Sequence, residues 1–356
     1  MTFSRRDFAK LAASAGASLA MPGVGFAQQS SKIDGVQIGA ITYSFRLGVD
    51  KKQIPAVMQK IGLSEAELMS GDAEAIAGMP SLPGGGGFGG PRNAGPVADA
   101  PNGCPANSPS GQAALRKAGQ APAARPGGNG PLTPEAEAMQ KQIAEWRMAA
   151  NTSTWKGVRK AYNDAGVDIQ ILCYNMRMGM KDDEIDYAFQ MARDLGVRAI
   201  SSSSTVEFAK RVAPFADKHK MMWAGHGHAN IFDDEEFAKP ETFKEIMGFS
   251  KYIGVNLDIG HFTAAGYDAV AYIPTIHDRI TNVHLKDRTK PDKCYVSANL
   301  PWGTGQTPIK EVLQLMRKNK YTFPANIEFE YATPAGSDSV AEVAKCYEYA
   351  KKCLVG

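Results

Sequence analysis

The chain has 356 residues, 44% of them hydrophobic, which is enough to bury the core of one large α/β domain or of two smaller ones. Its formal net charge is +3, and its basic residues are interspersed with acidic ones, so we expect no nucleic-acid-binding surface. The five cysteines are scattered and lack CxxC spacing, which predicts neither a zinc ribbon nor a disulfide framework; if the chain is exported, one pairing stays open.

The N-terminus, residues 1–27, predicts an export signal. "SRRDFAK" precedes an uncharged stretch rich in Ala, Leu, Ser and Gly, and "GFA" then supplies the small residues that a signal peptidase accepts. The paired Arg5 and Arg6 resemble a twin-arginine signal, which implies the twin-arginine export machinery as a partner and a periplasmic location. The uncharged stretch is too short and too rich in Gly and Ala for a stable membrane anchor. We expect a mature chain that begins near Gln28.

After the signal, short apolar runs alternate with stretches of helical spacing. The runs predict strands that begin at Val36, Ser64, Val167, Val197, Lys220, Ile253, Ile280 and Ala325. The helical stretches cover 51–61, 134–165, 182–195, 206–218, 238–250, 269–277, 309–318 and 339–354. Eight strands and eight helices predict an α/β fold, a (β/α)8 TIM barrel over residues 33–356. The competing open, doubly wound sheet normally has a glycine-rich loop after its first strand, and "AITYSFRLG" contains none.

A compositional break over residues 79–130 interrupts this pattern after the second strand. "PGGGGFGGPRNAGP" and "APAARPGGNGP" contain too few apolar residues to offset the entropy lost on ordering. We interpret the segment as a low-complexity Gly/Pro-rich insertion that is disordered or loosely held. The alternative is a mobile lid.

Polar residues gather where the predicted strands end, which is where a barrel of this kind carries its catalytic groups. They are Glu67, His226, His228, Asp258, His261, His284, Lys286, Asp287, Glu328 and Glu330. Taken singly, Asp258 could be a helix cap, His284 a hydrogen-bonded core histidine and Glu67 a salt-bridged barrel residue. Burial of both Glu328 and Glu330 on one strand face is costly unless a cation compensates. Together the set predicts one divalent ion, Mn, Zn, Fe, Co or Mg.

The order of three motifs resembles a known family. "NLDIGH", "NVHLKD" and "IEFEY" on successive strands resemble the xylose isomerase-like TIM barrels, the sugar phosphate isomerase/epimerase family. The resemblance implies a metal held by residues of strands five to eight, which places Asp258 and His284 as ligands and the last ligand at Glu328 or Glu330. "HGH" puts His226 where the family's epimerases have glutamate. Histidine can coordinate, but it does not simply replace a carboxylate as a proton-abstracting base.

The same resemblance implies further roles. His261 is the candidate for substrate oxygen contact or acid/base work, and Glu67 for a base or hydroxyl-binding group. Lys286 is a further catalytic candidate. Candidate substrate-binding residues are His228, Arg288, for which a solvated loop is the alternative, and Trp302 in "LPWGTGQ", whose ring could stack on a sugar.

The expected function is that of a metal-dependent isomerase or epimerase acting on a keto-sugar or keto-glycoside by enediolate proton transfer, with β-elimination where a leaving group adjoins the carbanion. The alternatives within enzymes are a keto-glycoside lyase or hydratase, an inosose dehydratase-like enzyme and an endonuclease IV-like phosphodiesterase. A non-catalytic periplasmic sugar-binding barrel is the alternative from another class. A homo-oligomer stays open.

Overall fold

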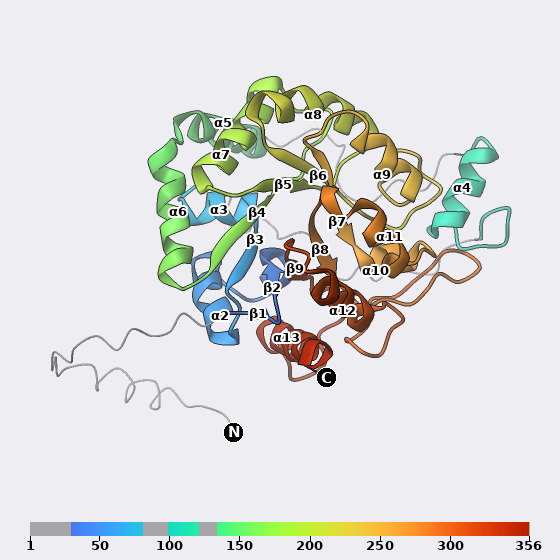
Figure 1. Cartoon of the computed structure of the whole chain (residues 1–356). Coiled ribbons are helices and arrows are strands. Elements are labelled where there is room, and N and C mark those ends of the chain that lie inside the picture. Colours follow the sequence, from blue (N-terminus) through green and yellow to red (C-terminus); the bar gives the residue numbers. More distant parts are fainter. Residues whose placement is uncertain (1–29, 81–98, 121–133, 356) are drawn as a thin grey trace.

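The computed structural model describes residues 30–80, 99–120 and 134–355, and these residues form a closed barrel of parallel strands surrounded by helices (Figure 1). The strands are β1 (Lys32–Ile33), β2 (Val36–Ile41), β3 (Glu65–Met69), β4 (Asp168–Cys173), β5 (Ala199–Ser202), β6 (Met222–His226), β7 (Ile253–Asp258), β8 (Ile280–Leu285) and β9 (Ala325–Ile327). β1 is a short antiparallel addition to β2. β2 to β9 pair in parallel in chain order, and the pairing of β9 with β2 closes the barrel. The (β/α)8 prediction is therefore confirmed.

Helices make up most of the remaining described structure, and the majority of them bury an apolar stripe against the strands. They are α2 (Ile54–Ile61), α3 (Ser70–Ile76), α4 (Pro109–Lys117), α5 (Pro134–Ala149), α6 (Thr152–Asp164), α7 (Asp182–Leu195), α8 (Val206–His219), α9 (Pro240–Met247), α10 (Ile259–Ala264), α11 (Ala269–Ile276), α12 (Ile309–Asn319) and α13 (Ser339–Val355), with 3₁₀ turns at Thr42–Phe45, Lys51–Gln53 and His277–Arg279. In α7, Ile185, Phe189 and Ala192 recur at helical spacing and are fully buried. Gly196 then ends the helix in the left-handed conformation, with φ of 70°.

Some elements differ from the sequence expectation. The helix predicted over 134–165 is two helices, because the side chain of Asn151 accepts a hydrogen bond from the backbone N–H of Ser153 at 2.9 Å and so starts α6. α3 and α10 have 7 and 6 residues, too few for a periodic pattern to be recognised in the sequence.

The predicted insertion is ordered in part. Of residues 79–130, the structure describes 79–80 and 99–120, and the latter include α4 and a disulfide between Cys104 and Cys294 with Cα atoms 5.6 Å apart. The scattered cysteines predicted no disulfide framework and left one pairing open for an exported chain, and the structure contains this one pairing. The partners are 190 residues apart, so cysteine spacing could not identify them. In Figure 1, α4 stands apart from the ring of helices, beside the loop that follows β8.

The predicted signal at 1–27 and the remainder of the insertion lie outside the described residues. Within the part of the chain that is described, no helix combines the length and apolarity that a membrane crossing requires.

Candidate active site

The candidate active site lies at the ends of β6 to β9, where an inner cavity of about 180 Å³ opens. Its lining includes all of the strand-end histidines together with Glu328 and Glu330. Strand register explains this grouping, since Asp258 on β7 is level with His284 on β8, and His284 is level with Asn326, two residues before Glu328. The barrel therefore brings residues from four separate strands to one point.

Four of these side chains form the group that we call the tetrad: His226, Asp258, His284 and Glu328. One potential ligand atom from each lies within 4.8 Å of the others, and all four residues are buried. In the described part of the chain, His226 Nδ1 is buried without a hydrogen-bond partner, and Asp258 Oδ2 makes no hydrogen bond but lies 3.1 Å from the Lys286 ammonium. Two imidazoles, one with an unsatisfied buried nitrogen, and two carboxylates fit a borderline divalent cation such as Zn²⁺, Mn²⁺ or Fe²⁺.

Asp258 is both a helix cap and a member of the tetrad. Its Oδ1 accepts a hydrogen bond from the backbone N–H of His261 at 2.7 Å, which starts α10, while Oδ2 lies 3.1 Å from the Lys286 ammonium. Gly260 permits this tight turn, because a Cβ at that position would lie 2.6 Å from the backbone oxygen of Lys286. Burial raises the pKa of Asp258 to about 6, against the opposing effect of the Lys286 ammonium.

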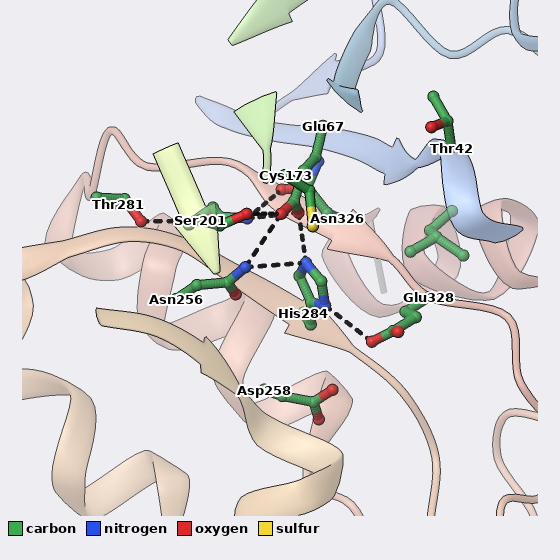
Figure 2. A network of polar contacts seen from close by, with 12 residues as sticks. Thr42, Glu67, Cys173, Ser201, Asn256, Asp258, Thr281, His284, Asn326 and Glu328 are labelled. Atoms are coloured by element: carbon green, nitrogen blue, oxygen red, sulfur yellow. Dashed lines mark hydrogen bonds and ion pairs between the residues drawn. The ribbon is translucent and has the colours of Figure 1, made fainter. Parts of the chain in front are cut away.

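His284 is held between two carboxylates, as Figure 2 shows. Its Nδ1 lies 2.8 Å from Oε2 of Glu328, and its Nε2 bonds Oε2 of Glu67. Burial lowers the pKa of His284, but Glu67 and Glu328 outweigh it and hold that pKa well above its ordinary value. Glu67 is fully buried and is not part of the inner-cavity lining. The geometry therefore gives Glu67 the place of a carboxylate that orients the candidate ligand His284.

A layer of polar side chains supports Glu67 inside the barrel. The amide nitrogen of Asn282 donates to Glu67 Oε2 at 2.8 Å, that of Asn256 donates to Oε1 at 3.2 Å, and the Ser201 hydroxyl also donates to Oε1. Asn326 accepts from Asn282 at 3.0 Å. These residues were not among the candidates from the sequence. A repeated signal does mark them, since an asparagine stands two residues before Asp258, His284 and Glu328 and so shares the same strand face.

Lys286 lies behind the carboxylates. Its ammonium is 3.1 Å from Asp258 Oδ2, 3.0 Å from Glu328 Oε2 and 2.6 Å from Glu330 Oε2, and the side chain is 2% exposed. Burial lowers the pKa of Lys286, but the three carboxylates raise it above its ordinary value. Glu330 pairs with Lys286 and stands outside the tetrad, so geometry favours Glu328 as the fourth candidate ligand.

His228 and His261 form the outer side of the inner cavity. Burial, followed by the Lys286 charge, lowers the pKa of His228 to about 4 and that of His261 well below its ordinary value, so both are uncharged at neutral pH. The Arg288 guanidinium bonds Nδ1 of His261. Because arginine can only donate, Nδ1 accepts and the proton of the neutral ring is on Nε2.

A comparison with known protein families identifies the same kind of barrel. The profile of the family described as xylose isomerase-like TIM barrel matches residues 134–350. The chain belongs to this family. No curated protein matches the sequence.

Solved structures share the barrel of this xylose isomerase-like chain. A sugar phosphate isomerase/epimerase from Parabacteroides distasonis is 16% identical with a TM-score of 0.53, over 95% of this chain and 100% of the other. A probable 3-DHS dehydratase, AsbF from Bacillus anthracis, is 12% identical with a TM-score of 0.53, over 88% and 99%. The IolI protein with a bound zinc atom is 10% identical with a TM-score of 0.53, over 90% and 96%. At these identities the likeness establishes the fold alone.

One candidate of this xylose isomerase-like barrel lies away from the site. Trp302 packs its ring edge-on against Tyr349 of α13, with centroids 6.1 Å apart, and does not line the inner cavity. Its loop folds around Asp287 instead, whose carboxylate accepts from the backbone N–H groups of Gly303 and Gly305 at 2.8 and 2.9 Å. Nothing in this arrangement supports the predicted stacking on a sugar.

The inner cavity also contains residues that the sequence did not single out, including Tyr43, Asn175 and Ser203. They follow β2, β4 and β5, the strand ends that have no histidine or acid after them. The position after a predicted strand was the available signal, but uncharged side chains gave no reason to select them.

Proposed function

We propose that the protein is a divalent-metal-dependent enzyme that isomerises or epimerises a keto-sugar or keto-glycoside. The observation that carries the proposal is the tetrad, whose four potential ligand atoms lie within 4.8 Å of one another at the strand ends of a xylose isomerase-like barrel, with His226 Nδ1 buried and without a hydrogen-bond partner. His226, Asp258, His284 and Glu328 would hold the ion. When bound, it supplies polarisation of a carbonyl and its neighbouring hydroxyl, which acidifies the C–H bond between them.

Other residues of the inner cavity would accept the proton from carbon and donate a hydrogen bond to the substrate oxygen. Glu330 lines the cavity outside the tetrad, and its carboxylate is the group that can accept the proton from carbon. His261 presents Nε2–H as a donor to a substrate oxygen, since Arg288 holds its Nδ1. Lys286 lies behind the carboxylates rather than in the cavity lining, so its role is to fix their positions.

The experiment that tests this function combines metal analysis with isotope exchange. The purified protein is expected to contain one divalent ion per chain, and it is incubated in D₂O with 3-keto-glucosides, ketohexoses and inososes. Deuterium uptake without loss of a leaving group supports an isomerase or epimerase, whereas release of a leaving group identifies the lyase alternative. Binding without exchange or turnover would make the protein a sugar-binding barrel. A metal-loaded protein that neither binds nor turns over any of them contradicts the proposal.

The proposed location is the periplasm, reached through the twin-arginine pathway. The signal-like N-terminus motivates it, and the Cys104–Cys294 disulfide supports it, because such bonds persist in oxidising compartments. Fusion of residues 1–27 to a reporter is expected to export it only in cells with an intact twin-arginine translocase, and export through the general secretion pathway would contradict the proposal.

Replacement of Glu67 tests the support of the metal ligands. Glu67→Gln removes the charge that faces Nε2 of His284, and we expect the affinity for Mn²⁺ to fall about 10- to 100-fold, the usual effect of losing such a partner. Titration calorimetry with Mn²⁺ measures the change.

Glu65→Gln is the matched control two residues away on the same strand face. Burial, followed by the nearby Glu67, raises the pKa of Glu65 well above its ordinary value, and the hydrogen-bond network places Glu65 against Asn326 rather than His284. Its Mn²⁺ affinity is expected to stay close to wild type. Equal affinities for both variants would show that Glu67 does not orient His284.

A further inference from the structure

The cleft at the mouth of the barrel has two connected parts. The inner cavity, of about 180 Å³, is lined by three members of the tetrad, His226, His284 and Glu328, and an outer cavity of about 500 Å³ shares His228 and His261 with it. Ligand pockets in proteins usually measure about 300–1,000 Å³, so the inner cavity alone is small. The space available to a ligand therefore extends outward past the two histidines.

Three distant segments form the outer cavity: residues 107–112 at the start of α4, residues 229–236 after β6 and residues 288–297 after β8. They contribute polar side chains, among them Gln112 and Ser297. Apart from the shared histidines, the described lining contains one cation, Arg288, and one acid, Glu236. It therefore has no concentration of positive charge for a phosphate group and suits a neutral ligand with several hydroxyl groups.

The disulfide joins two of these walls. Cys104 is close in sequence to the α4 wall, and Cys294 directly precedes Tyr295 in the wall after β8. A backbone hydrogen bond from Ser110 N–H to the Cys294 oxygen, at 3.4 Å, adds to the link. Residues 99–120 contain few large apolar side chains, so the covalent bond contributes strongly to holding this described part of the insertion against the cleft.

Tyr295 is held in an unusual conformation within this wall. Its φ is +59°, a region that non-glycine residues rarely adopt, and the Asp292 carboxylate fixes the turn by accepting from the N–H groups of Cys294 and Val296, both at 2.8 Å. The ring packs edge-on against Phe232, with centroids 4.9 Å apart. Such strain persists where surrounding contacts impose it, often at binding sites. The result is a half-buried aromatic ring in a polar cavity.

We propose that the outer cavity is a second subsite, built by the Cys104–Cys294 disulfide, that holds the second ring of a disaccharide or the aglycone sugar of a keto-glycoside. The inference rests on the proposed function, because the reacting keto ring would occupy the inner cavity. Tyr295 offers a flat face to the second ring, with Gln112 and Ser297 as hydrogen-bonding partners for its hydroxyl groups. Arg288 lies between the subsites, since it donates to Ser297 Oγ at 2.7 Å and bonds His261.

Paired probes test the subsite. Calorimetry on the metal-loaded protein compares fructose with lactulose, and methyl 3-keto-glucoside with 3-keto-cellobiose, so that each pair differs in the sugar beyond the keto ring. The wild-type protein is expected to bind the two-ring probe of at least one pair more tightly. Tyr295→Ala, and separately the double variant Cys104→Ser with Cys294→Ser, are expected to lower this preference about tenfold, as expected for one lost ring contact.

Tyr252→Ala is the matched control, since Tyr252 precedes β7 at the opposite end of the barrel, and it should retain the wild-type preference. Circular dichroism checks that each variant is folded, and Tyr295→Ala keeps the test decisive if the cysteine variant is not. Equal binding within both pairs, or a preference that survives Tyr295→Ala, overturns the subsite and leaves the proposed function standing. Failure of all four probes to bind overturns the subsite, and the proposed function falls with it only if the inososes fail as well.

Discussion

Asp258→Asn is expected to lose the bound metal and to lower kcat/KM by about a thousand-fold. The variant removes one of the two carboxylates of the tetrad, and its amide group would face the Lys286 ammonium, 3.1 Å from Asp258 Oδ2 in the native chain. Lewis-acid stabilisation by a bound ion contributes several kcal/mol, and each 1.36 kcal/mol corresponds to about a factor of ten in rate. Elemental analysis together with initial rates on a keto-sugar measures both effects.

Asparagine separates the two roles of Asp258, because its side-chain oxygen can still cap α10. Asp258→Ala removes the cap as well and should cost about 1 kcal/mol more of unfolding free energy. The control is Asp268→Ala, which removes an exposed cap: Asp268 Oδ1 accepts from Val270 and Ala271 at the start of α11, away from the site. Its activity should match wild type. Retention of metal and activity by Asp258→Ala, which has no ligand atom at this position, would exclude Asp258 as a ligand.

The barrel could be predicted because the pattern that identifies each strand or helix lies within a short stretch of the sequence. Strand runs such as the one from Ile253 and helices such as 182–195 carry their period within a few residues, and all eight barrel strands formed where those runs predicted. The break at Asn151 was missed because one capping residue interrupts an otherwise continuous helical pattern. The sequence therefore predicted whether a segment is a strand or a helix better than it predicted the residues at which that element ends.

The residues of the candidate site could be predicted for a different reason. In a parallel barrel every strand end lies on one rim, so Asp258, His284 and Glu328 could be grouped without knowledge of any contact. A helix cap and a metal ligand were the two alternative interpretations of Asp258. Its Oδ1 accepts from the backbone N–H of His261, whereas its Oδ2 makes no hydrogen bond, so one side chain allows both roles. Which of Glu328 and Glu330 joins the group depended on strand register and side-chain direction, which only coordinates provide.

Contacts between residues far apart in the chain could not be predicted from the sequence. Ser201 and Glu67 bond although 134 residues separate them, and Cys104 and Cys294 join across 190. Pairings of this kind leave no periodic pattern. The direction of the Trp302 ring could not be predicted either, because a loop on the catalytic side can still turn its aromatic ring toward an outer helix.

Lys286→Met is expected to destabilise the metal-free protein by about 3–5 kcal/mol, the usual cost of leaving buried charges without their partner. Asp258, Glu328 and Glu330 each lie within ion-pair distance of its ammonium, and the lysine is almost fully enclosed. A divalent ion at the tetrad would neutralise two of these carboxylates. Added Mn²⁺ should therefore raise the melting temperature of the variant by more than that of the wild-type protein, as thermal unfolding followed by circular dichroism can measure.

Lys160→Met is the matched control, because Lys160 pairs with Asp164 on the surface of α6 with 73% of its side chain exposed, and such pairs contribute at most about 1 kcal/mol. Glu330→Gln added to Lys286→Met removes the carboxylate that touches the lysine but lies outside the tetrad, so the double variant should recover part of the lost stability. If Lys286→Met were as stable as the control, the carboxylates would not be charged in the metal-free protein. If Mn²⁺ stabilised the variant no more than the wild type, the ion would not bind among them.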